Sequence, residues 1–288
     1  MSETPQLAII GGSGLYDMPD LEDKQEIKVH TPFGEPSAPV LVGTLDGVRI
    51  AFLARHGITH TIAPTQVNYR ANIYALKSLG VRCVAAVSAC GSLREDYAPG
   101  EIVIPDQLLD FTSQRSNSFF DEPGLVAHVG VADPFCNSFS EQLYAACRAA
   151  GATAYQGGAY ITVEGPRFST RAESNIFRSW GLSIIGMTTS PEAFLAREAE
   201  LCYAVMAHVT DYDVWHREPV SVDMVMRTIQ QNTHLAQDAV RKLAAGFQPP
   251  AGCDCPQALA NALITQKGNI TAAARKKLGV LVDKYLNE

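Results

Sequence analysis

Apolar segments typical of β-strands alternate with amphipathic, helix-like segments along almost the whole chain. Residues 7–12 (LAIIGG) and 81–92 (VRCVAAVSACGS) have the pattern of buried strands. Residues 67–80 and 221–246 carry apolar side chains at helical spacing. Alternating strands and helices predict a layered α/β protein. We find no internal repeat and no low-complexity linker, so residues 1–288 are expected to form a single three-layer α/β/α domain around a central β-sheet.

One hairpin makes the predicted sheet mixed. Asp46-Gly47 joins two apolar runs within residues 40–55, and Asp-Gly is a strong signal for an antiparallel hairpin. Further strands are expected at residues 101–112, 157–168, 182–186 and 202–215, and further helices at residues 140–151, 170–181, 189–201 and 271–286.

Composition limits the class of protein. The 288 residues carry a net charge of -7 with dispersed acidic residues, so no basic surface for nucleic acid is indicated. No apolar run approaches the length of about 18 residues that a membrane span needs. The N-terminal MSETPQ lacks the features of a secretion signal. We therefore expect a cytoplasmic protein that binds neither nucleic acid nor membrane.

Seven cysteines, an odd number, argue against a disulfide framework in such a chain. Cys253-Asp254-Cys255 is the one close pair, and no second cysteine or histidine cluster lies near it in the sequence, so no metal site is predicted. Two free thiols in a loop are the favoured interpretation. A redox-sensitive bridge between Cys253 and Cys255 is the alternative.

Polar and glycine-rich clusters follow the predicted strands. Ligands of open α/β sheets bind at the carboxyl ends of strands, so several of these clusters are expected to converge on one site. The clusters are residues 11–14, 55–60, 88–92, 164–169, 186–189 and 210–213.

The first cluster, GGSG, resembles the start of a phosphate-binding loop. As a dinucleotide fingerprint it has Asp17 at the third glycine position and is not followed by a long helix. A nucleoside triphosphate loop would need Gly-Lys-Ser/Thr, which is absent. Two interpretations remain. The loop either binds a small anion through backbone N–H groups and the Ser13 hydroxyl, or it is a plain tight turn. Arg55-His56 would add charge, because arginine presents a planar fork of donors to phosphate oxygens.

The cluster at the end of residues 202–215 is the most informative. Asp211 and Asp213 lie two residues apart, so on a continuing strand both side chains point to one face. Close carboxylates raise one another's pKa and suit acid and hydrogen-bond work on a base. A metal would need a third hard ligand, and none is identifiable. Nearby, Glu164 could bind sugar hydroxyls and Phe168 could stack on a planar base.

Taken together, the motifs closely resemble one family. GGSGLYD, ARHG, VNYRANIYALKSLG, EGPRFSTRAES, MTTSPEAFLAREAEL and TDYDVW occur in the order found in the S-methyl-5'-thioadenosine phosphorylases, which are trimeric purine nucleoside phosphorylases. The resemblance implies the nucleoside phosphorylase fold and phosphorolysis of methylthioadenosine by inorganic phosphate as co-substrate, with no metal or organic cofactor. The tail from about residue 252 resembles a C-terminal helical extension of microbial members.

The resemblance also implies roles for individual residues. The implied phosphate site is Ser13, Arg55, His56, Ser88, Ala89 and Thr188. Phe168 and Ser169 would contact the base, Met187 the ribose, Asp211 the purine N7 and Asp213 the exocyclic amine. Val222, Val225 and Met226 would line the 5'-methylthio pocket. His128 would reach that pocket from a neighbouring subunit, which implies a homotrimer or a dimer of trimers.

Three other functions stay open at this level. A sibling phosphorylase could prefer 6-oxopurines or methylthioinosine, although the Asp211/Asp213 pair favours 6-aminopurines. A nucleoside-binding protein without catalysis and an NAD-dependent dehydrogenase are the remaining candidates. Gly186 is a departure from the family, because other members carry asparagine before the Met-Thr dipeptide.

Overall fold

A mixed β-sheet forms the centre of the protein, and the computed structural model describes residues 4–12, 15, 18–216 and 220–286. In these residues eleven strands pair in the order β2-β3-β4-β1-β5-β10-β9-β7, while β11 pairs with β5 and β6, and β6 with β8. The strands are β1 Leu7–Gly11, β2 Glu22–Ile27, β3 Val40–Leu45, β4 Val48–Ala54, β5 Cys83–Ser92, β6 Ile102–Ile104, β7 Gln107–Phe111, β8 Ala154–Gln156, β9 Ala159–Val163, β10 Ile184–Gly186 and β11 Cys202–Asp211.

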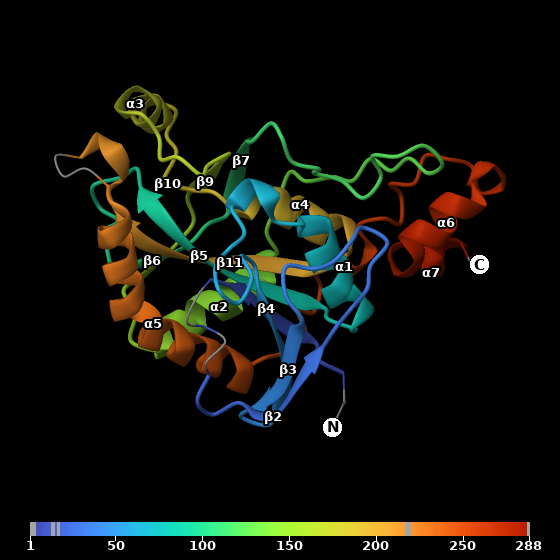
Figure 1. Cartoon of the computed structure of the whole chain (residues 1–288), viewed down its shortest axis with the longest axis horizontal. Coiled ribbons are helices and arrows are strands. Elements are labelled where there is room, and N and C mark those ends of the chain that lie inside the picture. The colour runs from blue at the N-terminus through green and yellow to red at the C-terminus, as the bar shows by residue number, and fades with distance from the viewer. Residues whose placement is uncertain (1–3, 13–14, 16–17, 217–219, 287–288) are drawn as a thin grey trace.

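Helices cover both faces of this sheet. They are α1 Tyr69–Ser78, α2 Asn137–Ala149, α3 Arg171–Ser179, α4 Thr189–Glu198, α5 Val222–Ala245, α6 Ala272–Leu278 and α7 Asp283–Leu286. Figure 1 shows α2 and α5 on one side of the sheet and α1 and α4 on the other. The predicted three-layer α/β/α architecture with a mixed sheet is confirmed.

Strand alternation explains the two cores. Successive side chains of a strand point to opposite faces. In β1, Leu7 and Ile9 pack in the cluster with α2 and α5, whereas Ala8 and Ile10 pack in the cluster with α1 and α4. The inner strands are therefore apolar on both faces, as the continuous runs of the sequence indicate.

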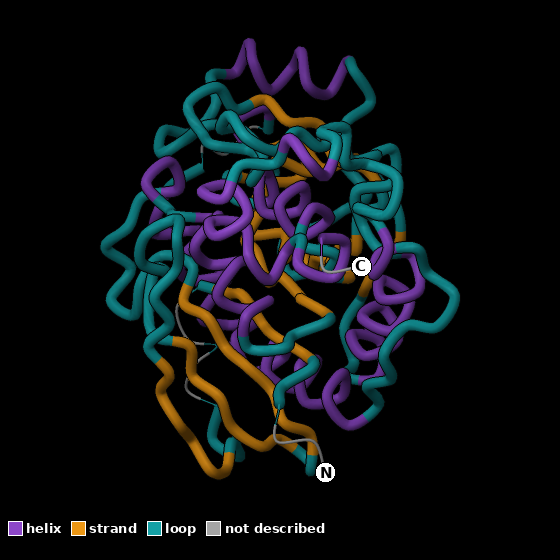
Figure 2. The backbone as a smooth tube through the Cα atoms, turned by 90° about the vertical axis from the view of Figure 1, so that its right-hand side faces the viewer, coloured by secondary structure: helices purple, strands orange, loops and turns teal. Residues whose placement is uncertain are grey.

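The antiparallel end of the sheet contains one confirmed and one missed element. β3 and β4 form the predicted hairpin, and Asp46 and Gly47 have φ values of 49° and 79°, which suit a turn between twisted strands. Strand β2 was not predicted, because its residues EDKQEI are mostly charged and exposed. Charges on an edge strand protect it from pairing with other chains. Figure 2 shows this end of the sheet extending beyond the helices.

Two other segments differ from expectation. The single strand predicted at residues 101–112 is divided at Pro105-Asp106 into β6, which pairs with β8 and β11, and β7, which pairs with β9. Proline cannot donate to a strand ladder. The single helix predicted at residues 271–286 breaks at Gly279, whose φ is 43°, into α6, a 3-10 turn and α7.

The C-terminal segment packs against the rest of the chain. Leu259, Leu281 and Val282 are buried in the same cluster as the face of α1 and α4. Ala127 forms a β-bridge with Leu263, so the long connection between β7 and α2 runs beside this segment (Figure 1). Among the described helices, none combines the length and apolarity that a membrane crossing requires.

Candidate active site

A cavity of about 580 Å³ opens where the carboxyl ends of β1, β4, β5, β9, β10 and β11 meet the first turns of α5. Its volume lies in the range of small-molecule sites. The predicted convergence of strand ends is therefore found. Its lining includes thirteen predicted site residues: Arg55, His56, Ser88, Ala89, Phe168, Ser169, Met187, Thr188, Asp211, Asp213, Val222, Val225 and Met226. Ser13 lies outside the described residues, although its neighbour Gly12 lines the cavity.

Among the described residues of this lining, Arg55 is the one strongly basic group, and it is almost completely buried. Its Nε and Nη2 donate to the two carboxylate oxygens of Glu192 at 2.9 and 2.8 Å, and Nη1 donates to the Val87 carbonyl at 3.1 Å. Tyr203 also donates to Glu192, at 2.8 Å. A bidentate pair fixes the plane of the guanidinium. One N–H on each of Nη1 and Nη2 is left for a ligand anion.

His56 is held as a neutral imidazole beside Arg55. Its Nδ1 lies 2.9 Å from the Ile62 carbonyl, and its ring stacks on His60 with centroids 4.6 Å apart. Burial, reinforced by the charge of Arg55, lowers the pKa of His56 to about 4. Because the carbonyl can only accept, Nδ1 carries the proton and Nε2 is the acceptor. His56 can therefore accept a hydrogen bond from a protonated phosphate oxygen.

Small hydroxyl-bearing residues complete this end of the cavity. The hydroxyl oxygens of Ser88, on β5, and Thr188, before α4, are 3.2 Å apart, and both residues are buried. Ala89 lies next to Ser88 in the same lining. Together with Arg55 they form a compact group of donors for an anion of phosphate size.

Two carboxylates also line the cavity. Asp211 accepts from the Thr210 hydroxyl at 2.6 Å and from the Asp213 backbone N–H at 2.8 Å. Burial raises the pKa of Asp211, while the Thr210 hydroxyl and the Asp213 N–H oppose that rise. Burial also raises the pKa of Asp213. Oδ2 of Asp213 is buried and makes no hydrogen bond of regular geometry within the described part of the chain, although the nearby Ser174 hydroxyl opposes the rise of its pKa.

The way in which these carboxylates come together differs from the prediction. β11 ends at Asp211, and Asp213 begins a 3-10 turn with a φ of 49°, so strand alternation does not set their relative directions. Gly91 on β5 allows their close approach. A Cβ at position 91 would lie 3.0 Å from Asp211 Oδ1 and 3.2 Å from the Asp213 Cβ.

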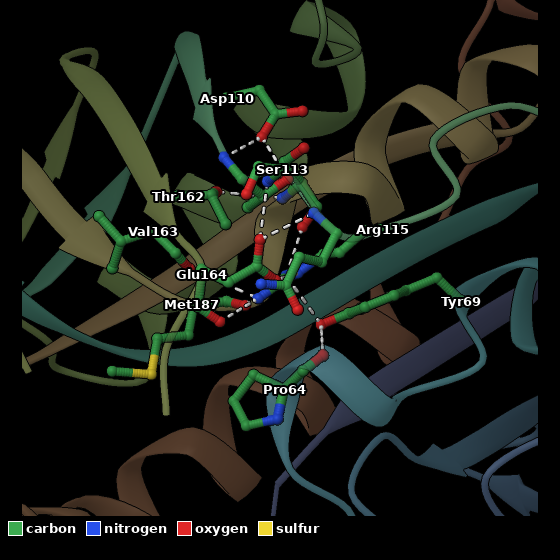
Figure 3. A network of polar contacts seen from close by, with 12 residues as sticks. Pro64, Tyr69, Asp110, Ser113, Arg115, Thr162, Val163, Glu164 and Met187 are labelled. Carbon is green, nitrogen blue, oxygen red and sulfur yellow. Dashed lines mark hydrogen bonds and ion pairs between the residues drawn. The ribbon is translucent and has the colours of Figure 1, made fainter. Parts of the chain in front are cut away.

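Arg115 holds several walls of the cavity in place, as Figure 3 shows. Its Nη1 donates to the carbonyls of Met187 and Ser190 at 2.7 and 2.8 Å, and its Nε donates to Glu164 at 3.0 Å. Glu164 also accepts from the backbone N–H groups of residues 113 and 114. The suggested binding of sugar hydroxyls by Glu164 is therefore not supported, because Glu164 is not among the residues that line the cavity and both of its oxygens hold Arg115 and residues 113 and 114.

The apolar residues at the mouth of the cavity are exposed in the single chain. Val222 and Met226, on the first turns of α5, are 67% and 41% exposed, and Phe168 is 38% exposed. His128 does not line this cavity. It is exposed, and its backbone N–H donates to the Ala262 carbonyl in the C-terminal segment.

The structure explains Gly186. A Cβ at position 186 would lie 1.8 Å from the Tyr160 hydroxyl oxygen, so that hydroxyl occupies the space of a side chain there. Tyr160 is fully buried, and its hydroxyl has no hydrogen-bond partner among the residues described. Gly186 and Tyr160 thus act as a complementary pair behind the cavity wall.

Three functional residues were missed from the sequence: Glu192, Arg115 and Tyr160. The sequence did offer a signal for Glu192, because it lies among apolar residues of a predicted helix. A buried acid needs a charged or hydrogen-bonding partner. Arg115 and Tyr160 gave no local signal, because their partners lie far away along the chain.

A second group of side chains also differs from expectation. No other cysteine lies near Cys253 and Cys255 in the sequence, but the folded chain brings two more close to them. In space, the sulfur atoms of Cys136 and Cys202 lie beside them, within 4.8 Å. The prediction that these two cysteines have no further metal ligands beside them is therefore wrong.

Known proteins resemble the chain over most of its length. The profile of the Phosphorylase superfamily matches residues 6–245. An S-methyl-5'-thioadenosine phosphorylase of Geobacter sulfurreducens is 51% identical over 283 residues, which cover 97% of this chain and 99% of the relative. The crystal structure of a methylthioadenosine phosphorylase from an Antarctic soil metagenomic library has a TM-score of 0.91 and 44% identity, covering 97% of this chain and 99% of that one.

A further solved structure contains the nucleoside itself. It is a single-site mutant of the Schistosoma mansoni adenosine/methylthioadenosine phosphorylase in complex with methylthioadenosine. Its TM-score is 0.79 and its identity 38%, with 84% of this chain and 91% of that chain covered.

Proposed function

The chain belongs to the S-methyl-5'-thioadenosine phosphorylase family of the phosphorylase superfamily, and we propose that it catalyses the reaction for which that family is named. Inorganic phosphate attacks C1' of S-methyl-5'-thioadenosine, the bond to N9 breaks, and adenine and S-methyl-5-thioribose 1-phosphate form. The observation that carries this proposal is one cavity whose lining combines a cationic, hydroxyl-rich group of residues with two carboxylates. We propose phosphate as co-substrate, with no organic cofactor or metal in the reaction.

Phosphate binds at the end formed by Arg55, His56, Ser88 and Thr188. The free N–H groups of Arg55 face the anion, and Glu192 keeps the guanidinium in a fixed plane. Neutral His56 accepts a hydrogen bond at Nε2 from the P–OH group of phosphate, which suits the monoprotonated dianion. Donors fixed before the reaction need no reorganisation as charge moves from phosphate to the ribosyl cation.

Asp211 assists the leaving group at the purine N7. A purine leaves poorly as an anion, and a proton donated at N7 removes that charge. The raised pKa of Asp211 favours the protonated form that donates. The Thr210 hydroxyl has one hydrogen and two acceptors within reach, Asp211 Oδ2 at 2.6 Å and the Cys90 carbonyl at 3.2 Å. The Thr210 hydroxyl can therefore donate to Asp211 when the carboxylate is ionised and to the Cys90 carbonyl when Asp211 is protonated.

Asp213 selects the base. Its buried Oδ2 makes no hydrogen bond of regular geometry in the described structure, and an exocyclic amine supplies a well-placed donor. A 6-oxopurine presents an acceptor at this position, which would face a carboxylate unfavourably. On α5, Val222, Val225 and Met226 favour a methylthio group over a 5'-hydroxyl.

We propose that the active assembly is a homotrimer, or a dimer of trimers, in which a neighbouring subunit covers the 5' end of each cavity. The exposure of Val222 and Met226 supports this, because a methylthio group gains little from a pocket that stays open to water. His128 lies outside its own chain's cavity and is the candidate residue from the neighbour. Native mass spectrometry tests the assembly, and a monomer that is fully active would contradict it.

A nucleoside panel with and without phosphate tests the function. We expect methylthioadenosine to be cleaved faster than adenosine, and inosine hardly at all, each only with phosphate present. Asp211→Asn should lower kcat on methylthioadenosine by about 10²–10⁴-fold through loss of the general acid. Asp213→Asn should shift the ratio of activities toward inosine. An unchanged ratio would contradict the role of Asp213, and turnover without phosphate would contradict phosphorolysis.

A further inference from the structure

Four cysteine thiols from separate parts of the chain meet at one point outside the nucleoside cavity. The sulfur atoms of Cys136, Cys202, Cys253 and Cys255 all lie within 4.8 Å of one another. Cys202 and Cys253 are 3.5 Å apart at their sulfurs. In a tetrahedral zinc tetrathiolate with Zn–S bonds of about 2.3 Å, the sulfurs are about 3.8 Å apart. Small side-chain movements therefore bring all four sulfurs to this spacing.

Two of the four thiols belong to the rigid α/β core. Cys136 is the N-cap residue of α2, and Cys202 is the first residue of β11. The two elements are tied together there, because the Cys136 backbone N–H donates to the Tyr203 carbonyl at 2.9 Å. Both thiols are buried. The core thus presents two sulfur atoms in a fixed relation.

The other two thiols belong to the segment that follows α5. Cys253 is partly exposed, and Cys255 is buried at the start of a 3-10 turn. Between them, Asp254 forms a bidentate ion pair with Arg197 of α4, at 3.0 and 2.8 Å. This pair also holds the segment against the core, so the position of Cys253 and Cys255 does not depend on their sulfurs alone.

An arginine side chain and the start of a helix lie beside the cluster. Arg197 Nη1 lies 3.5 Å from the Cys255 sulfur. The Phe139 backbone N–H, in the first turn of α2, donates to the Cys136 backbone carbonyl at 3.0 Å. Arginine side chains and the first turn of a helix such as α2 stabilise a thiolate once its proton has left.

We propose that Cys136, Cys202, Cys253 and Cys255 bind one Zn²⁺ ion in a structural site that fastens the C-terminal segment to the α/β core. Four S–H bonds break, four Zn–S bonds form and four protons leave to solvent, with no electron transferred. The site then carries a charge of -2, which Arg197 partly balances. Soft thiolate ligands select zinc against magnesium and calcium, and four protein ligands leave no open position for catalysis.

The position of the cluster fits a role in stability. None of the four cysteines lines the nucleoside cavity. Cys202 instead lines a second cavity of about 120 Å³ between the core and the C-terminal segment, which offers an approach for the ion. Loss of the ion should therefore loosen the packing of Leu259, Leu281 and Val282 and leave the substrate KM unchanged.

Metal analysis of the full-length protein, expressed with zinc and purified under reducing conditions without chelator, tests the proposal. We expect about one zinc per chain in a closed four-cysteine site. All seven thiols should be titratable after denaturation in the presence of a chelator. Cobalt added to the zinc-free protein should give the intense visible bands of a tetrahedral thiolate site. Chelation should lower Tm without changing the KM for nucleoside.

A matched pair of variants separates this site from adventitious binding. Cys253→Ser removes the most exposed ligand and should lose the zinc and the cobalt bands. Cys147→Ser changes a buried cysteine of α2 that lies outside the cluster and should keep both. If Cys253→Ser does not fold, the wild-type measurements still decide. Folded wild-type protein without zinc and without cobalt bands, or a disulfide between any two of the four cysteines, would overturn the proposal.

Discussion

The pair of Arg55 and Glu192 offers a direct test of how the chain prepares its anion site. Both side chains are at most 2% exposed, and two charge-assisted hydrogen bonds of 2.8–2.9 Å join them. In Glu192→Gln, the amide oxygen keeps one of these bonds, but the amide NH₂ then faces a donor. Breaking a buried pair by altering one partner costs about 3–5 kcal/mol. Because glutamine keeps the shape and one bond, we expect a loss near the lower end, about 3 kcal/mol.

Two measurements separate stability from positioning in this variant. Urea denaturation gives the free energy of unfolding, and steady-state kinetics gives KM for phosphate and for the nucleoside separately. Freed from Glu192, the guanidinium can rotate, so KM for phosphate should rise much more than KM for nucleoside. A merely structural role would leave the ratio of the two KM values unchanged.

Asp96→Asn is the matched control. Arg94 and Asp96 also form a bidentate pair, at 2.8 and 2.6 Å, but their side chains are 44% and 60% exposed. Exposed pairs contribute about 0–1 kcal/mol. If Glu192→Gln destabilised the protein no more than Asp96→Asn, and left the KM for phosphate unchanged, the reasoning about Arg55 would be refuted.

Three other changes follow from buried groups. Burial raises the pKa of Glu198 from 4.5 to about 7, so the folded state binds the proton more tightly than the unfolded state. Stability therefore falls as pH rises from about 4.5 to 7. Glu198→Gln should flatten the dependence of Tm on pH in that window, and an unaltered pH profile would contradict this. Gly186→Ala places a methyl group against the Tyr160 hydroxyl and should cost about 1–3 kcal/mol in urea denaturation. Adding Tyr160→Phe removes the nearest atom but leaves the ring Cζ at 2.8 Å from the new Cβ, so it should restore part of the lost stability; no restoration would contradict the pairing. Arg115→Lys keeps the charge but loses the fork that holds the Met187 and Ser190 carbonyls, so Tm should fall and KM for nucleoside should rise more than KM for phosphate. An equal rise of both KM values would point to a structural role only.

Much of the fold was predictable because local sequence patterns agree with the strands, helices and turns that form in the folded chain. The Asp46-Gly47 turn, the two-sided apolar strands and the glycines after helices are set by nearby residues. Strand β2 was not predictable from its local pattern, because its charges protect the sheet edge from pairing with other chains and hide the apolar alternation of a strand. The division at Pro105-Asp106 depends on partners in β8, β9 and β11, which lie far along the chain.

The cavity lining was predictable, but its support was not. Ten of the thirteen predicted residues that line the cavity belong to glycine-rich and polar strand ends, and the family resemblance added Val222, Val225 and Met226 on α5. The residues that hold them there were missed: Glu192 lies 137 positions from Arg55, and Arg115 lies 72 from Met187. The same limit applies to the cysteines, because Cys136 and Cys253 are neighbours only after the sheet and α2 have formed.

The identity of the sugar product tests the central claim most directly. Methylthioadenosine is incubated with the protein and one equivalent of phosphate, and ³¹P NMR is followed together with adenine absorbance. The account predicts a sugar 1-phosphate signal that grows in step with adenine and with the loss of inorganic phosphate. Adenine accompanied by free methylthioribose, at a rate independent of phosphate, would contradict it.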